Sequence, residues 1–298
     1  MWFKNLVVYR LNQWNETSAS LAEKLSLKSL QPCAGMDMQS RGWVAPKGED
    51  EPIVHTLGPQ MMISLGVEKK LLPTTVINQF AKARAAEIEE QQGYKPGRKQ
   101  MKEIKEAVTD ELLPRAFVIS RKTYIWIDPV DQLLVVDAAN ISKADEVIEM
   151  LHKTIDGISL SFIKTQVAPT AAMTAWLGGN DLLANFTIDQ DCELRGRGDA
   201  AATVRYVRHT LDDDEVKKHI KSGKEVTKLG LTWDDKISLV LHDNLQLKCI
   251  SPLDIIKEQE KVDDHEDTFD TDFAIMTGEL KKLLPAIFDA LGGEANRD

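Results

Sequence analysis

The residues best suited to chemistry in this sequence are lysines and arginines that gather in short stretches. The stretch 95–105 contains five cations and one acid, Glu103. If a helix begins after Gly97, its basic side chains line one side: Arg98, Lys99, Lys102 and Lys105. Glu103 and Glu106 are then expected on the far side. Such a stripe suits contact with phosphates, and the alternative is an ordinary solvated helix face.

A second group of cations follows later in the chain. Arg205 and Arg208 flank Tyr206, an arrangement that suits phosphate contact combined with base stacking. The stretch 217–228 adds further candidates for phosphate contact: Lys218, Lys221 and Lys224. Acids at 212–215 precede these lysines, and that order also suits a helix dipole. A purely structural explanation therefore stands beside the functional one.

Several patterns that resemble enzyme motifs lack the surroundings that their chemistry needs. Residues 196–201 match a dinucleotide-binding pattern, but residues 203–207 predict a strand where that motif needs a helix. The acids at 263–267 lack the glycine and the spacing of a calcium loop. The histidines form no zinc pair, and no serine or cysteine lies in a nucleophile elbow. We therefore expect no catalytic residue, no cofactor and no metal.

The net charge of −10 is unusual for a protein that binds phosphates. The acids, however, are unevenly distributed, because residues 254–272 alone hold nine acids and two lysines. A cationic surface is therefore compatible with an acidic chain. Composition permits nucleic-acid binding without demonstrating it.

Length and composition predict a soluble globular protein. The chain has 298 residues, of which 43% are hydrophobic, enough for two or three subdomains. No apolar run approaches the roughly 20 residues that cross a bilayer. The N-terminus lacks a secretion signal, and three distant cysteines form no disulfide framework. We expect a cytoplasmic protein without membrane contact.

Strand and helix patterns occur in mixed, mostly local order, which predicts an α+β fold. Strands are expected at 3–10, 61–67, 116–119, 124–127, 133–136, 160–163, 186–194, 203–207, 226–231, 237–241 and 245–250. Helices are expected at 17–28, 143–153, 169–177, 212–221 and 272–291, followed by a frayed tail from 292. Residues 45–58 are expected to form a loop or hairpin.

The segment 74–115 carries two helical patterns broken at 93–97, which predicts a projecting helical hairpin. We expect three parts. A central α/β domain comprises 1–73 and 116–168, the hairpin forms a tip, and residues 169–298 form a second α+β domain at the base.

Phe117 follows this hairpin directly. A large ring at that position belongs either to the core of the subunit or to a contact with a second subunit. The pattern alone leaves both readings open.

Several landmarks together resemble the RdgC family. The chain opens with Trp2-Phe3-Lys4-Asn5-Leu6 and Tyr9-Arg10-Leu11, as RdgC proteins do. Further landmarks follow in the family's order: residues 112–117 (LLPRAF), 126–128 (WID), 226–229 (VTKL) and 276–280 (MTGEL). The resemblance extends from the first residue nearly to the last.

The resemblance implies a homodimer closed into a ring around double-stranded DNA, bound without sequence preference. It also implies restraint of RecA-driven strand exchange and association with the nucleoid. By motif position, Arg98, Lys99 and Lys102 face DNA, Phe117 contacts the partner hairpin, and Lys228 belongs to a second dimer contact. The segment 205–208 departs from the family, where lysines are common.

Two alternatives from other classes remain. One is a cytosolic adaptor whose basic faces bind acidic proteins. The other is an enzyme that uses the 196–201 loop for a nucleotide or the 263–267 acids for a metal.

Overall fold

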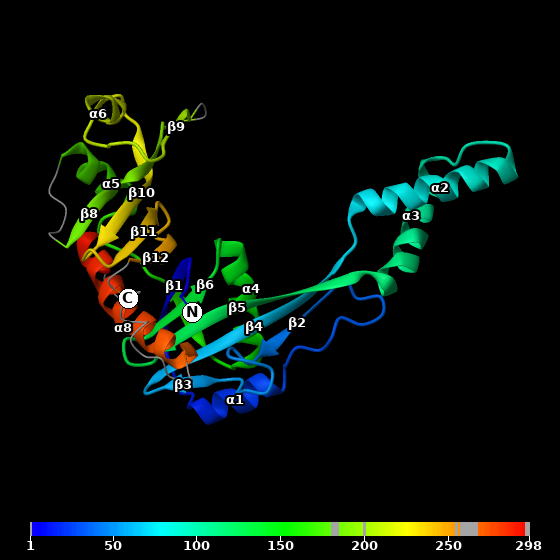
Figure 1. Cartoon of the computed structure of the whole chain (residues 1–298), viewed down its shortest axis with the longest axis horizontal. Coiled ribbons are helices and arrows are strands. Elements are labelled where there is room, and N and C mark those ends of the chain that lie inside the picture. Colours follow the sequence, from blue (N-terminus) through cyan, green and yellow to red (C-terminus); the bar gives the residue numbers. More distant parts are fainter. Residues whose placement is uncertain (1, 180–184, 199–200, 254–255, 257–267, 296–298) are drawn as a thin grey trace. The chain divides into compact units, whose positions relative to one another are not determined.

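The computed structural model describes residues 2–179, 185–198, 201–253, 256 and 268–295. The chain divides into two compact units. Unit 1 comprises residues 1–21, 54–62 and 124–298, and unit 2 comprises residues 22–53 and 63–123. Strands β4 (Gln60–Leu71) and β5 (Phe117–Asp128) each contribute residues to both units. Figure 1 gives the labels of the elements.

The N-terminal strand lies inside unit 1. β1 (Leu6–Gln13) pairs antiparallel with β6 (Leu133–Asp137), β7 (Ser159–Phe162) and β12 (Leu247–Pro252). β3 (His55–Leu57) pairs with the start of β4, and the end of β5 pairs with β6. Helix α4 (Ile141–Thr154) begins at Asn140, whose side chain accepts a hydrogen bond from the Lys143 amide.

The second half of unit 1 is an antiparallel sheet in the order β12-β11-β10-β8-β9. Its strands are β8 (Phe186–Arg195), β9 (Thr203–Tyr206), β10 (Glu225–Trp233), β11 (Ile237–His242) and β12. Burial alternates along β11, so one face of the sheet is apolar and the other is polar. The apolar face belongs to a core shared with α5 (Pro169–Gly178) and α8 (Thr268–Ala290). Figure 1 shows α8 running along these strands. The short helix α6 (Asp214–Lys221) lies between β9 and β10 in sequence.

Unit 2 combines strands with a pair of helices. β2 (Gln39–Val44) pairs antiparallel with β4, and α1 (Ser18–Ser26) enters the unit at Ala22. Helices α2 (Thr74–Gln92) and α3 (Arg98–Leu112) pack together around a small core of Ala81, Ile104 and Val108. A 3₁₀ turn, η1 (Leu113–Arg115), leads into β5.

The expected α+β mixture of strands and helices is confirmed. The expectation of mixed sheets was wrong, because the strands described above pair antiparallel. Most expected elements are present within a few residues, including the three-strand meander β10–β12. The division into a tip, a centre and a base stays a prediction.

The loop or hairpin expected at 45–58 includes β3, which forms a hairpin with β4. Three local expectations were wrong. The strands expected at 116–119 and 124–127 are one strand, β5. No strand was expected at β2, where a Cβ on Gly42 would lie 2.3 Å from the Leu30 backbone. The last described residues are not frayed, because Ala295 donates a backbone hydrogen bond to Lys164 (2.8 Å).

Candidate nucleic-acid interface

The basic residues of α3 are all exposed. Arg98, Lys99, Lys102 and Lys105 face solvent, while Ile104 and Val108 are buried against α2. Lys102 forms an ion pair with Glu106 (3.6 Å). The expectation that Glu106 lies on the far side was wrong, since residues four apart are neighbours on a helix. The pair is solvent-exposed, so its strength is only about 0.3–0.5 kcal/mol and it leaves Lys102 available.

A second ion pair joins the two helices of unit 2. The Arg84 guanidinium on α2 lies 3.0 Å from the Glu111 carboxylate on α3. Together with the small apolar core, this contact fixes the helices beside each other. Helix α2 therefore holds α3, with its basic side chains, in a fixed position.

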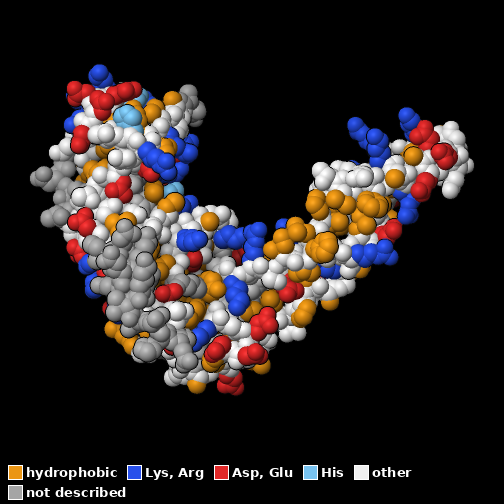
Figure 2. Space-filling model, viewed as in Figure 1, with side chains coloured by type: hydrophobic (Ala, Val, Ile, Leu, Met, Phe, Trp, Pro, Cys, Tyr) orange, Lys and Arg blue, Asp and Glu red, His pale blue; other side chains and the backbone are white. Residues whose placement is uncertain are grey.

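Phe117 is not part of the core of the chain, because 84% of its surface is exposed. Val118 and Ile119 are exposed beside it, as are Leu71 and Phe80 elsewhere in unit 2. Figure 2 shows hydrophobic side chains gathered on the visible face of this unit. We name this set, Leu71, Phe80, Phe117, Val118 and Ile119, the exposed apolar set. Its contact with a second subunit stays a prediction.

The lysines of α6 and the following turn lie at the surface of unit 1. Lys218 and Lys221 are exposed, and the Lys224 ammonium lies 3.3 Å from Nδ1 of His219. The Asp213 side chain caps the helix by accepting from the Glu215 amide (3.3 Å). Acids at the start and lysines at the end match the helix dipole, as the sequence indicated.

One carboxylate collects two of the predicted cations. Glu193 on β8 is in register with Arg205 on β9 and with Lys228 on β10. Its Oε2 accepts from Nη2 of Arg205 (2.6 Å) and from the Lys228 ammonium (2.9 Å). Partial burial raises the pKa of Glu193, but these hydrogen bonds outweigh it and hold the pKa at about 2. Sequence reasoning missed Glu193, because strand register cannot be read from residue types.

The same row continues across the sheet. His242 on β11 pairs with Lys228, and Lys248 on β12 pairs with Val240, two residues from His242. Burial and the positive charges of Lys248 and Lys228 lower the pKa of His242 to about 4. The imidazole is therefore neutral at pH 7. Figure 2 shows basic side chains over the β9–β10 part of unit 1.

The phosphate contact expected of the 205–208 segment stays a prediction, and both Arg205 and Arg208 are exposed. Tyr206 packs its ring against His209 and His219, at centroid distances of 5.1 and 6.2 Å. Arg208 has a positive φ of 53°, and its amide donates to the Asp191 carboxylate (2.9 Å). Arg205 alone of the two arginines joins the row with Glu193.

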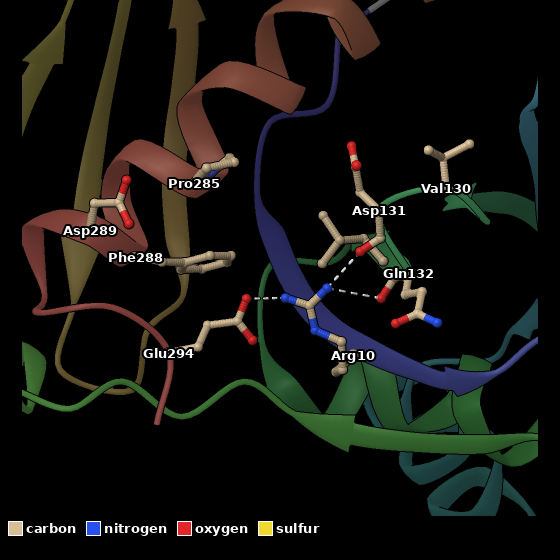
Figure 3. A pocket seen from close by; sticks show the side chains of 9 residues that line it. Arg10, Val130, Asp131, Gln132, Pro285, Phe288, Asp289 and Glu294 are labelled. Atoms are coloured by element: carbon tan, nitrogen blue, oxygen red, sulfur yellow. Dashed lines mark hydrogen bonds and ion pairs between the residues drawn. The ribbon is translucent and has the colours of Figure 1, made fainter. Parts of the chain in front are cut away.

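A cavity of about 500 Å³ lies in unit 1. Figure 3 shows Arg10 at its centre, paired with the Glu294 carboxylate and donating to the carbonyls of Asp131 (2.6 Å) and Gln132 (3.2 Å). A buried cation needs such partners, so Arg10 joins β1 to the last described residues. We interpret this site as structural.

The remaining enzyme motifs gain no support. In the described ranges, no group of three or more His, Cys, Asp or Glu side chains could hold a metal. The 196–201 loop leads into β9, a strand, although residues 199–200 lie outside the described ranges, as do the acids at 263–267. No described helix has the length and apolarity needed to cross a membrane.

Comparison with known proteins identifies the family. The sequence model of the family described as "Putative exonuclease, RdgC" matches residues 1–294. The chain therefore belongs to the RdgC family. It is 53% identical over 300 residues to "Recombination-associated protein RdgC" of Janthinobacterium sp. (strain Marseille), with 100% of both chains covered.

Two further relatives carry the same name. The protein of Herminiimonas arsenicoxydans is 54% identical, with 99% of each chain covered. The protein of Bordetella parapertussis is 52% identical, again with 99% of each chain covered. These names associate the relatives with recombination and mention no enzymatic activity, whereas the family description names an exonuclease.

Proposed function

We propose that this protein binds double-stranded DNA without sequence preference and without catalysis. The observation that carries the proposal is the exposed basic side of α3, where Arg98, Lys99, Lys102 and Lys105 are held by a fixed helix pair. Cations on such a stripe contact phosphates, and phosphates are the same in every sequence. The recombination-associated names of the relatives support a nucleic acid as the partner.

The proposed active form is a homodimer closed into a ring. The exposed apolar set supports this form, because a large exposed phenyl ring followed in the chain by exposed Val118 and Ile119 is typical of a protein contact. A two-fold axis would bring the same set of both subunits together. A second contact would involve the region of Lys228.

A ring explains how an acidic chain holds DNA. Acidic outer surfaces discourage adventitious binding, while the basic residues attract the duplex inside. Enclosure also lowers the affinity that each contact must supply. Duplex enclosed by the ring is less accessible to RecA-driven strand exchange. Because it binds duplex, the protein associates with the nucleoid in the cytoplasm.

Binding to unrelated duplexes at several salt concentrations tests this proposal. We expect affinities that agree within a few-fold and fall with a log–log slope near −0.9 per phosphate contacted. A strong preference for one sequence, or a flat response to salt, would exclude the phosphate mechanism. Analytical ultracentrifugation with and without duplex reports the dimer in the same samples.

The adaptor and enzyme alternatives are separated by two further measurements. An adaptor would bind acidic proteins and show no salt-dependent shift of duplex. An exonuclease would shorten end-labelled duplex when Mg²⁺ or Mn²⁺ is added, whereas we expect the label to stay at full length. Titration with a nucleotide or a metal, followed by thermal shift, tests whether the protein is an enzyme that uses the 196–201 loop or the 263–267 acids.

A further inference from the structure

The strongest unassigned feature is a group of three sulfur-containing side chains in one loop of unit 2. The loop precedes β2 and carries Cys33, Met36 and Met38 within six residues. Met36 and Met38 are 53% and 45% exposed, and Cys33 is partly exposed. Methionine and cysteine are usually buried, so packing of the core does not account for this group.

Hydrogen bonds bring the cysteine sulfur to the segment that carries both methionines. The chain turns at Gly35, which has a φ of 48°, and the Asp37 amide donates to the carbonyl three residues earlier (2.9 Å). The Cys33 thiol donates to the Asp37 carbonyl (3.0 Å). Its sulfur therefore lies against the residue between Met36 and Met38.

Strand β4 fixes the backbone of this loop at three points. The Glu68 carboxylate accepts from the Cys33 amide (2.8 Å), and the Lys70 amide donates to the Met38 carbonyl (3.0 Å). The ammonium of the buried Lys70 donates to the Gly35 carbonyl. The methionine side chains are exposed and have three rotatable bonds each, so their sulfurs can approach the thiol while the backbone stays in place.

One thiolate and two thioethers are ligands that a soft metal ion prefers. Thiolate and thioether sulfur select Cu(I), whereas Zn²⁺ is bound by thiolate, imidazole or carboxylate. The expectation that the chain holds no metal rested on zinc and calcium patterns, in which thioether sulfur is not a ligand. The cytoplasm proposed for this protein keeps thiols reduced, and Cu(I) is the reduced form of copper.

We propose that Cys33, Met36 and Met38 bind one Cu(I) ion. The thiol releases its proton to solvent as the Cu–S bond forms, and no electron is transferred. The charge of the thiolate then balances that of the ion. This site is independent of the proposed DNA binding, so either proposal can fail without the other.

Anaerobic titration with Cu(I), in competition with the chelator bicinchoninate, measures affinity and stoichiometry on the full chain. We expect one ion per chain in the wild type. Because loss of an outer-shell partner already costs about 10–100-fold in metal affinity, Cys33→Ser should lose about 100-fold or more. Cys249→Ser is the matched control, since Cys249 is exposed and has no methionine near it in the sequence. Equal losses for the two variants would overturn the proposal.

The methionines distinguish a metal site from an isolated thiol. Met36→Leu combined with Met38→Leu nearly conserves volume at two exposed positions, so the fold should be unchanged. We expect this double variant to bind Cu(I) about tenfold more weakly although Cys33 is intact. Binding as tight as in the wild type would overturn the proposal, because the thiol alone would then suffice. Thermal melting of each metal-free variant checks the fold, and the methionine variant decides if Cys33→Ser is unfolded.

The identity of the ligands and of the ion is checked separately. X-ray absorption of the copper-loaded protein should show sulfur neighbours alone, and nitrogen or oxygen neighbours would contradict the ligand set. One ion shared by two chains would overturn a site within a single loop. Zn²⁺ at equal concentration should leave Cu(I) bound, and displacement by Zn²⁺ would overturn the assignment to a soft ion.

Discussion

The basic side of α3 and the row on the β8–β12 sheet contain the same kinds of residue but present them differently. On α3, Glu106 is the only acid of the described residues that forms an ion pair with these cations, through Lys102. The helix packs on a core of three small or medium side chains. On the sheet, Arg205 and Lys228 are held by Glu193, above an extensive core. A cation's position in the sequence therefore does not indicate how much of its charge is available to a ligand.

The largest predicted effect is the loss of duplex affinity when the basic residues of α3 are replaced. Replacing Arg98, Lys99 and Lys102 together by alanine should weaken binding to all duplexes by 10²-fold or more near 0.1 M salt, and should flatten the salt slope by about one unit per lost contact. Folding should survive, because exposed substitutions usually cost about 0.5 kcal/mol or less each. Fluorescence anisotropy and thermal melting measure both. Unchanged affinity in the folded variant would assign this side to a solvated helix face.

Phe117→Ala tests whether unit 2 also supplies a dimer contact. The exposed ring predicts a loss of stability of about 0.5 kcal/mol or less, rather than the 3–5 kcal/mol typical of a buried phenylalanine. The dimer should open more often, so dissociation from closed circular duplex should become several-fold faster. Linear duplex of equal length is the control. Unchanged retention on circles would remove Phe117 from the proposed contact.

Single substitutions sharpen the comparison between the two surfaces. Arg98→Ala should lower duplex affinity several-fold, whereas Arg205→Ala should change it by less than about twofold, since Glu193 already neutralises that arginine. The salt slope should change by about one unit for Arg98→Ala and remain the same for Arg205→Ala. Equal losses for the two variants would contradict the difference between the surfaces.

The smallest effect concerns pH and stability. The folded-state pKa of Glu193, about 2, lies below the ordinary value of 4.5. Its contribution to stability is therefore complete above pH 4.5 and is lost as the pH falls toward 2. The melting temperature of Glu193→Gln should be lower than that of the wild type at pH 7, and the difference should shrink below pH 4.5. Glu225→Gln is the matched control, because it removes a carboxylate that pairs with Arg197 on the same sheet. A difference in melting temperature between Glu193→Gln and the wild type that stays constant from pH 7 to pH 3 would contradict this account.

The periodic spacing of hydrophobic residues predicted those helices and strands that bury one face. β11 alternates cleanly between buried and partly exposed residues, and α3 places Ile104 and Val108 on one side. The sequence pattern divided β5 into two strands because residues 117–122 are all exposed and show no alternation of burial. β2 was missed because Gly42 is required by the nearby Leu30 backbone, a contact that no local pattern indicates.

The candidate site was predictable in its residue types but not in its pairing. Cationic stretches and the position of Phe117 are visible in the sequence, and the family resemblance added their roles. The convergence of Arg205 and Lys228 on Glu193 depends on the register of three consecutive strands, β8, β9 and β10. The pairing of β8 with β10 also shifts register between Val226 and Lys228, and no pattern of residue types indicates such an irregularity.

The position of β1 has a consequence for synthesis of the protein. Leu6 pairs with both Asp137 and Leu247, and Arg10 on the same strand pairs with Glu294. A ribosome releases residue 6 long before it polymerises residue 294, so the first strand waits for its final neighbours until residue 294 has been synthesised. Unit 2 ends at residue 123 and has all of its chain available much earlier. The α2–α3 pair can therefore assemble while much of unit 1 is still being translated, and unit 1 closes last.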